Sequence, residues 1–328
     1  MPPIAVPLVL GIDAAWTAHQ PSGVALVEQC GECSRCLAVA PSYDSFLALA
    51  AGEPVDWQKR PQGSTPEVAV LLAAAEQLGR RPVDLIAYDM PLSTEKISGR
   101  RAADRQVSQL FGSRGCAVHS PTALRPGVMA NKIRATLQEL DYPLHVAGEV
   151  RGEKGVIEVY PHVALLALLQ LPFRFPYKVS RSLQYWKSEH LSAEARIERL
   201  LHQFVQIRVA LDQHIGAIDL PLPEPETVAS LSALKSWEDC LDALICAWVG
   251  MEHLQGRTQG LGDATAASEP VTQQPQAGLE VSAAPKGLPA NLQATAPKTP
   301  RFFLPEHSHS YEGLQAQLAG LALSVMQP

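Results

Sequence analysis

Three short apolar runs along the chain each lead directly into an acidic side chain. The runs and their acids are Leu8–Ile12 with Asp13, Val83–Tyr88 with Asp89, and Val156–Ile157 with Glu158. Runs of this length are typical of buried strands. Because an unpaired carboxylate is costly to bury, each acid is expected at a strand end that faces a cleft, a cation or a ligand. Three such strands predict one shared metal-binding cleft.

Two further strands and several helices are predicted from the same patterns. Residues 22–27 and 36–40 have the apolar character of strands, and residues 31–34 would form the hairpin turn between them. The predicted helix at residues 65–78 also has capping signals, because Pro66 stands at its first position and Gly79 follows its end. The predicted helical segments are 42–49, 65–78, 99–140 in interrupted pieces, one that starts at Pro161, 193–211 and 237–254.

The order of these elements predicts the fold class. Three strands come first, and two more follow with helical segments before each of them. Strands joined by short turns form an antiparallel meander, whereas strands joined through helices are added in parallel. We therefore expect an α/β fold, with a ribonuclease H-like mixed five-stranded sheet flanked by helices.

The composition of the chain changes after about residue 257. Gln, Ala, Pro, Thr and Ser dominate up to residue 300 and the hydrophobic periodicity disappears, which is typical of a disordered linker. The sequence thus predicts a ribonuclease H-like domain at 1–256, a disordered linker at 257–300 and a tail at 301–328. Weak amphipathic spacing from Leu314 to Val325 predicts a short helix in the tail.

The last helix of the predicted domain adds two acids to those at the strand ends. Asp239 and Asp242 stand three residues apart on one helix face, whereas Glu238 lies about 100° round the helix. Together with Asp13 and Asp89 they offer carboxylate oxygens that can bind two divalent cations, Mg²⁺ or Mn²⁺. Such ions activate water and stabilise the leaving oxygen in phosphodiester hydrolysis.

Each acid also has a structural interpretation. An acid at a strand end is often a helix cap or a turn former. Asp239 would simply be an acid that the positive N-terminus of its helix stabilises. Glu158 would pair with an arginine. The metal-site hypothesis depends on the combination, because the order of the elements brings the acids to one cleft.

Several motifs resemble the domain-of-unknown-function family 429, described as predicted nucleases of the ribonuclease H-like superfamily. They span about residues 6–255 and are specific in their order and spacing. The matching segments are GIDAAW (11–16), SGVA (22–25), YDMPL (88–92), GRRAADR (99–105), EVYPH (158–162), YK (177–178) and DCLDA (239–243).

This resemblance implies both the fold and a set of site residues. Asp13, Asp89 and Asp242 match the positions at which nucleases of the superfamily carry metal-binding acids. Glu158 and His162 belong to a motif of the family itself, and Glu158 would act in catalysis together with Asp239, by completing the metal shell or positioning water. The segment from Asp239 also looks like the final acidic helix of the bacterial Holliday-junction resolvases. The implied activity is metal-dependent hydrolysis of nucleic acid.

A nucleic-acid substrate requires side chains that contact phosphate. The stretch from Arg80 to Arg134 holds ten Lys and Arg residues and four acids, although the whole chain has a formal charge of −6. The residues expected to bind the substrate are Arg101, Arg105, Lys178 and His162, with Lys187 and Arg196 as weaker candidates. The alternative for the arginines is a solvated helix face, with Asp104 paired to Arg100 or Arg101.

Two other features have both a functional and a structural interpretation. His162, at the start of a predicted helix, would be a general acid or a metal ligand, or else a helix cap or a packed core residue. Cys30, Cys33 and Cys36 resemble part of a metal knuckle. A ferredoxin-like run would place its fourth cysteine at position 40, which is Ala in this chain. A hairpin turn that is rich in cysteine is therefore favoured over a metal site.

The composition limits the class of protein. An apolar content of 46% and a charged content of 18% are typical of a globular protein, and no stretch is apolar enough for a membrane helix. The apolar start lacks the basic region and cleavage site of a signal peptide, so a cytoplasmic location is expected. The expected partner is nucleic acid, with no membrane.

The leading hypothesis is a divalent-metal-dependent nuclease or phosphodiesterase with a two-metal mechanism. A phosphotransferase of the actin and sugar-kinase type also begins with a Gly-Ile-Asp strand. It needs Gly-rich phosphate loops in two halves, and the sequence offers no good second loop. A non-catalytic binding scaffold is the third hypothesis, because a fold does not fix a function.

Overall fold

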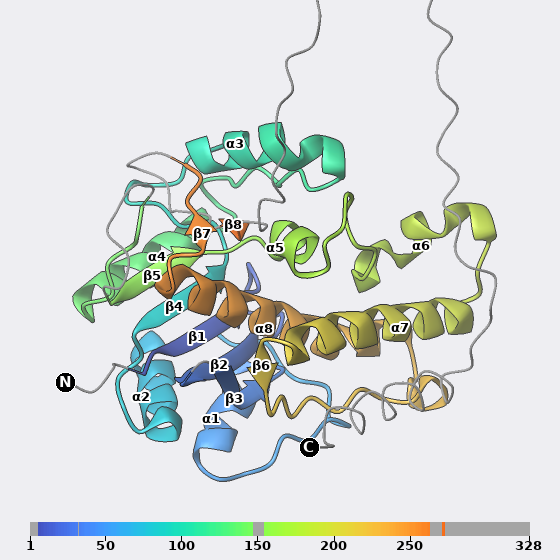
Figure 1. Ribbon diagram of the computed structural model, residues 1–328, viewed down its shortest axis with the longest axis horizontal. Helices are drawn as coiled ribbons and strands as arrows, with labels where there is room; N and C mark the ends of the chain where they lie inside the picture. Colours follow the sequence, from blue (N-terminus) through green and yellow to red (C-terminus); the bar gives the residue numbers. More distant parts are fainter. Residues whose placement is uncertain (1–5, 32, 147–153, 263–270, 273–328) are drawn as a thin grey trace, which may run out of the picture. The chain divides into compact units, whose positions relative to one another are not determined.

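A mixed sheet of six strands lies at the centre of the fold, in the order β5-β4-β1-β2-β3-β6 (Figure 1). The computed structural model describes residues 6–31, 33–146, 154–262 and 271–272. Its strands are β1 (Leu8–Asp13), β2 (Gly23–Cys30), β3 (Cys33–Ala40), β4 (Leu85–Asp89), β5 (Gly155–Glu158) and β6 (Ile215–Gly216), with β7 (Thr258–Gln259) and β8 (Val271–Thr272) in a separate pair.

The strand pairing confirms the predicted meander and the two predicted parallel additions. β1, β2 and β3 pair antiparallel, while β4 lies parallel to β1 and β5 lies parallel to β4. The prediction of five strands was wrong, because β6 adds a sixth strand parallel to β3. β6 has only two residues, and a strand of that length leaves no periodic pattern in the sequence.

Helices cover both faces of the sheet. They are α1 (Tyr43–Ala50), α2 (Val68–Gly79), α3 (Ala102–Phe111), α4 (Gly127–Glu139), α5 (Pro161–Leu168), α6 (Ser182–Tyr185), α7 (Ala193–Asp212) and α8 (Lys235–Leu254). Single turns of 3₁₀-helix are η1 (Gly112–Arg114), η2 (Val179–Arg181), η3 (Lys187–Glu189), η4 (Pro225–Thr227) and η5 (Leu231–Leu234).

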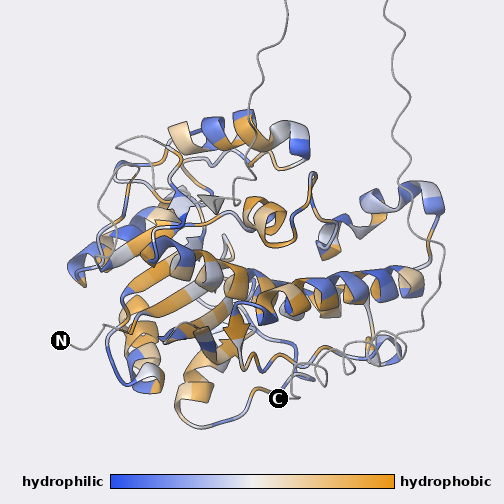
Figure 2. Ribbon diagram, in the orientation of Figure 1, coloured by the Kyte–Doolittle hydropathy of each residue, from blue (hydrophilic) through white to orange (hydrophobic). Residues whose placement is uncertain are grey.

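Alternate residues of the strands pack into two separate cores, as the period of a strand requires. Val9 and Ala87 join a core with α5, α7 and α8, whereas Leu10 and Ile86 join a core with α1, α2 and α4. Figure 2 shows hydrophobic residues along β1, β2 and α8, whereas α7 alternates between hydrophobic and hydrophilic residues. α8 is buried all round over most of its length, because it lies between the sheet and α7.

The helix boundaries differ from the predicted ones where the capping chemistry is unusual. α2 begins at Val68 after the N-cap Glu67, so the prediction of Pro66 at its first position was wrong. It ends with Gly79 inside the helix, because Arg80 itself adopts the left-handed conformation that was expected of a glycine. By contrast, α5 begins at Pro161 as predicted.

Ordered structure continues past the predicted domain boundary at residue 256. β7 pairs antiparallel with β8, and the buried Leu261 packs with Val107 and Val163. The remainder of the predicted linker, residues 263–270 and 273–300, and the predicted tail at 301–328 lie outside the described residues.

The cysteine-rich segment forms the predicted hairpin, but the turn is shorter than the predicted residues 31–34, because β3 already begins at Cys33. Cys30 and Cys33 are paired residues at the ends of β2 and β3, and Gly31 between them has the positive φ of 63° that a tight turn uses. Both cysteines are exposed, whereas Cys36 is buried and its thiol donates to the carbonyl of Ala38.

Two glycines allow the backbone of α8 to lie directly on the sheet. A Cβ atom at Gly11 of β1 would lie 2.2 Å from the carbonyl oxygen of Ala243, and one at Gly23 of β2 would lie 2.0 Å from that of Asp239. Both contacts are with helix backbone, which cannot move aside as a side chain can. Gly11 and Gly23 therefore fix how closely α8 approaches β1 and β2.

We expect Gly11→Ala to destabilise the fold by about 3 kcal/mol, because the added methyl group must push the whole helix away from the sheet. Urea denaturation followed by circular dichroism measures this change. Gly99→Ala is the matched control, since a Cβ at Gly99 meets no atom within 4 Å. Equal stability of the two variants would contradict the close-packing argument.

Candidate functional site

The carboxyl ends of β1 and β4 and the first turns of α8 bring four predicted acids together. Asp13 is directly in register with Asp89 on the parallel neighbour strand, and on its other side it pairs with Gly23. Because Gly23 touches the backbone of Asp239, the start of α8 lies beside Asp13. Asp13 and Asp89 are half-buried, whereas Asp239 and Asp242 are fully buried.

Two residues after α5 hold Asp242 in place. The Tyr177 hydroxyl donates to Asp242 Oδ1 at 2.6 Å, and the Lys178 ammonium forms an ion pair with Asp242 Oδ2. Lys178 was predicted to bind phosphate, but in the structure its ammonium contacts carboxylates. Tyr177 was not predicted to contact an acid, although the Tyr-Lys pair was one of the motifs that resembled the family.

Glu238 also belongs to this cluster, although its angle on the helix had ranked it below Asp239. Its carboxylate lies 3.3 Å from Lys178 Nζ and 3.1 Å from Lys235 Nζ, and it accepts the backbone N–H of Val179 at 2.6 Å. Lys235 also pairs with Asp239. The spacing of Lys235 three and four residues before two acids was the sequence signal for these pairs.

The five acids of the cluster outnumber its two lysines, Lys178 and Lys235, which pair with Glu238, Asp239 and Asp242. Burial and the neighbouring Asp13 raise the pKa of Asp89 well above its usual value. Burial likewise raises the pKa of Asp239, despite Lys235, and that of Asp242 to about 6, despite Lys178. The pKa of Glu238 is instead lowered, because Lys178 and Lys235 outweigh its burial. The cluster therefore has a surplus of negative charge around Asp13 and Asp89.

The carboxylates fit a hard divalent cation in charge and donor type, since Mg²⁺ and Mn²⁺ prefer oxygen ligands. The side chains are not arranged as a finished metal site. Among the described residues, no three His, Cys, Asp or Glu side chains are grouped closely enough to hold a metal ion. Lys178 binds Asp242, so a cation would compete with this ammonium for the carboxylate.

Glu158, at the end of β5, is paired with Arg101 in a buried network. Both carboxylate oxygens accept from the guanidinium, at 2.5 and 2.6 Å, and Oε2 also accepts the N–H of Leu92 at 2.7 Å. Arg101 further binds Asp104 through Nε and Nη2 and the carbonyl of Leu92 through Nη1. All five guanidinium N–H groups thus have partners.

These contacts agree with the structural interpretation of Glu158 and Asp104, in which each acid pairs with an arginine. They tie the loop after β4 to β5 and to the start of α3. A phosphate contact by Arg101 would require donors that the network already uses. Arg105 is exposed and uses one N–H group on the carbonyl of Arg100, so it is the more accessible of the two predicted arginines.

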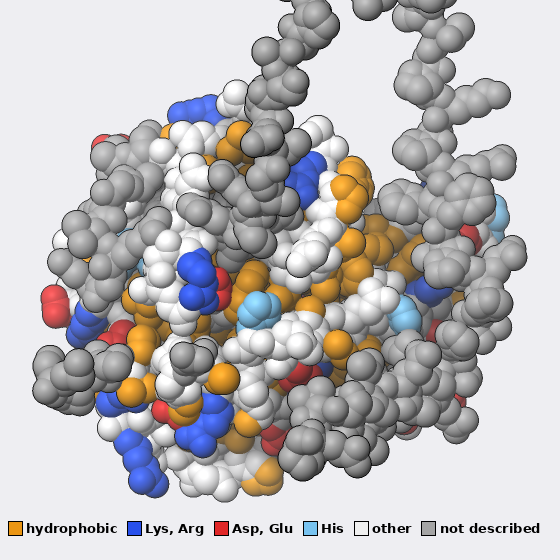
Figure 3. Space-filling view, viewed as in Figure 1, with side chains coloured by type: hydrophobic (Ala, Val, Ile, Leu, Met, Phe, Trp, Pro, Cys, Tyr) orange, Lys and Arg blue, Asp and Glu red, His pale blue; other side chains and the backbone are white. Residues whose placement is uncertain are grey.

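The basic stretch from Arg80 to Arg134 spans β4, α3, η1 and the first part of α4. Lys and Arg side chains lie at separate places on the face shown in Figure 3, with acidic and hydrophobic side chains between them. Arg100 bonds to Ser108 within its own segment.

His162 lies in the first turn of α5, next to the Tyr177 side of the acid cluster. Its ring is 5.4 Å from the ring of Tyr177, and its Nε2 is 2.5 Å from Nη2 of Arg174. Burial, with Lys178 and Arg174 nearby, lowers the pKa of His162 well below its usual value. The imidazole is therefore neutral at pH 7. Its pairing with Arg174 could not be predicted from the sequence pattern.

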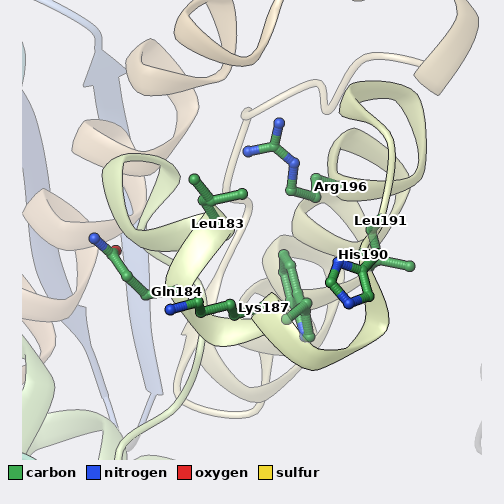
Figure 4. Close-up of a pocket in the computed structure, with 7 residues that line it drawn as sticks. Leu183, Gln184, Lys187, His190, Leu191 and Arg196 are labelled. Carbon is green, nitrogen blue, oxygen red and sulfur yellow. The ribbon is translucent and has the colours of Figure 1, made fainter.

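A surface cavity of about 320 Å³ lies outside this site (Figure 4). Figure 4 shows Arg196 extending from the start of α7 toward Leu183 on α6. Lys187 and Arg196, two weak candidates for phosphate contact, line this cavity, whereas none of the clustered acids does.

The fold and the site together define a mixed α/β protein with a carboxylate cluster at the ends of two neighbouring parallel strands. The chain belongs to the family described as protein of unknown function (DUF429), whose model matches residues 11–266. No curated protein and no solved structure matches the chain. In the part of the chain that the structure describes, every helix is too short or too polar to cross a membrane.

We expect Asp89→Asn to stabilise the metal-free protein at pH 8. Because folding raises the pKa of Asp89, its carboxylate opposes folding increasingly as the pH rises above the unfolded pKa of about 4. The gain in the free energy of unfolding should be at least about 1 kcal/mol at pH 8 and should vanish near pH 3.5. Urea denaturation across this pH range measures it. Glu53→Gln, at an exposed acid, is the control, and a less stable Asp89→Asn at pH 8 would refute the charge surplus.

We expect Arg101→Gln to cost about 3–5 kcal/mol of stability, because it leaves the buried Glu158 and Asp104 without their cation. Arg105→Gln removes the same charge from an exposed position and should change stability by less than about 0.5 kcal/mol. Thermal unfolding of both variants distinguishes the two arginines. Similar stabilities would show that the Arg101 network is not structural.

Proposed function

We propose that the protein is a divalent-metal-dependent phosphodiesterase, with nucleic acid as its substrate, on a ribonuclease H-like fold. The observation that carries this proposal is the register of Asp13 with Asp89 at the ends of β1 and β4, beside the acidic first turns of α8. The order of the five longer strands, β3-β2-β1-β4-β5, supports the ribonuclease H-like assignment.

Asp13 and Asp89 are the acids best suited to bind a cation from solvent. Both are half-buried, and neither forms an ion pair with a Lys or Arg side chain of the described residues. The burial and mutual repulsion that raise the pKa of Asp89 would be relieved by a nearby positive charge. A bound Mg²⁺ or Mn²⁺ would act as a Lewis acid and lower the pKa of a bound water.

The other acids have supporting tasks in this proposal. Tyr177 and Lys178 each bind one oxygen of Asp242, so a cation held by Asp13 and Asp89 would have to displace Lys178 to reach Oδ2. Asp239 lies next to Asp13 and would accept a proton or position water, because burial raises the pKa of its carboxyl group. Glu158 keeps the loop after Asp89 in place through Arg101 and Leu92.

Two other functions make different predictions about the same residues. A phosphotransferase of the actin and sugar-kinase type would bind ATP, which calorimetry detects directly. A non-catalytic scaffold would show no Mn²⁺ site that depends on Asp13. In such a scaffold, Lys178 would neutralise Asp242 permanently, and no cation would displace its ammonium from the carboxylate.

We expect Asp13→Asn to lower Mg²⁺- or Mn²⁺-dependent cleavage by at least about a hundredfold, because it removes a charged ligand of the cation. The assay uses single-stranded, duplex and branched DNA and RNA with each metal. Circular dichroism should show that the variant remains folded, and calorimetry should show weaker Mn²⁺ binding.

The exposed Glu53→Gln variant is the control for a general loss of negative charge and should cleave like the wild type. Equal cleavage by wild type and Asp13→Asn would refute the proposed role of Asp13. Mn²⁺ binding that is identical in both proteins would refute the metal site itself.

A further inference from the structure

Cys30 and Cys33 are free, exposed thiols at the closed end of the β2–β3 hairpin. They are direct partners in the antiparallel register, and only two residues separate them in the chain. Paired residues of antiparallel strands have Cα atoms about 4.5–5.5 Å apart, and their side chains lie on the same face of the sheet. A disulfide requires Cα atoms roughly 4.4–6.8 Å apart. The backbone therefore already holds the two cysteines at the separation that a disulfide needs.

Cys36, the third cysteine of the motif, is not available to this pair. It is the partner of Val27, and both residues belong to the core that contains α7 and α8. Because side chains alternate along a strand, Cys30 and Cys33 lie on the opposite face of the sheet from Cys36. Burial raises the pKa of the Cys36 thiol to about 12, so this thiol stays protonated at neutral pH. The motif is thus divided into an exposed pair and a core residue.

A metal ion matches the exposed pair less well than a disulfide does. A structural zinc site takes four protein ligands, and the pair supplies two. Glu28 lies beside the pair, since the thiol of Cys30 donates to its Oε1 at 3.7 Å. However, the Glu28 carboxylate already forms ion pairs with Arg35 and Arg81. The described residues therefore offer no third ligand, in agreement with the lack of a metal-binding group among them.

We propose that Cys30 and Cys33 form a reversible disulfide by exchange with a low-molecular-weight disulfide such as glutathione disulfide. The thiolate of one cysteine attacks the S–S bond of the small disulfide and releases one thiol from it. The second cysteine attacks the resulting mixed disulfide, closes the bond between Cys30 and Cys33 and releases the second thiol. The two cysteines lose two protons and two electrons, and the small disulfide takes up both as it becomes two thiols.

The place of the pair in the fold makes this bond both accessible and independent of the acid cluster. Both cysteines are exposed, so small thiols and disulfides reach the sulfur atoms without any opening of the fold. Exposed disulfides are typically the labile and regulatory ones. Cys30 is the last residue of β2, whereas Gly23, the partner of Asp13, is the first. The exchange therefore leaves the acids unchanged and does not depend on the proposed phosphodiesterase activity.

Oxidation of the full-length protein in glutathione buffers of graded ratio tests the proposal. After acid quenching and alkylation of the remaining thiols, peptide mass spectrometry should show Cys30 and Cys33 linked to each other, with two hydrogen atoms fewer than the dithiol. Because the second attack is intramolecular, the linked form should exceed the mixed disulfide by at least about tenfold at about 1 mM glutathione.

Single-cysteine variants show whether the two thiols act as a pair. Cys30→Ser and Cys33→Ser should each lose the linked form and should stop at the mixed disulfide with glutathione. Cys36→Ala is the matched control, because Cys36 lies on the other face, and its midpoint of oxidation should stay within about twofold of the wild type. Circular dichroism should show that all three variants remain folded.

Three results would overturn the proposal. The first is a wild type that stops at mixed disulfides on both cysteines, and the second is a bond from Cys30 or Cys33 to any other cysteine or to a second chain. The third is protection of the two thiols from alkylation that a chelator removes and a reductant does not, because a metal ion would then occupy the pair. Asp13→Asn should oxidise as the wild type does, so a failure of the proposed cleavage leaves this test intact.

Discussion

The direct backbone contact between α8 and the sheet is the constraint on which the rest of the structure depends. At Gly11 and Gly23 no side chain separates the strands from the helix, so the backbone of α8 lies directly on β1 and β2 at these two positions. This approach places the first turns of α8 at the strand ends, where Asp13 and Asp89 already stand. A larger residue at either glycine would move the acids of the helix and the hydrophobic core together.

The charges of the region are separated into two neighbouring zones. Acids dominate around Asp13 and Asp89, whereas donors and cations dominate around His162 and Arg174. Tyr177 and Lys178 form the border, because they contact residues of the acid zone through polar atoms and the donor zone through the Tyr177 ring.

The sheet was largely predictable from the sequence, because its strands are long apolar runs with clear turns between them. Register explains why Asp13 and Asp89 could be placed together: strands joined in parallel through a helix bring their carboxyl ends to one edge. β6 could not be predicted, because a strand of two residues shows no alternation of hydrophobic and polar positions. The C-terminal end of α2 could not be predicted either, because it depends on the left-handed backbone conformation of Arg80.

Side-chain partnerships were the part that the sequence could not supply. The spacing of Arg101 and Asp104 indicated a helical pair, but the addition of Glu158, 57 residues further on, follows only from the fold. The same holds for Lys178 with Asp242 and for Arg174 with His162. Such pairs depend on where loops run between elements, and loop paths leave no periodic signal.

The position of α8 in the chain has a consequence for synthesis. β1, β2 and β4 are complete by residue 89, but the helix that covers one face of them spans Lys235–Leu254. At a synthesis rate of about 5–20 residues per second, that face stays uncovered for roughly 10 s or more on the ribosome. During this interval the hydrophobic strands are exposed and the acid cluster does not yet exist. The acid cluster is therefore complete only once α8 docks on the sheet, and translation products that end before this helix lack it.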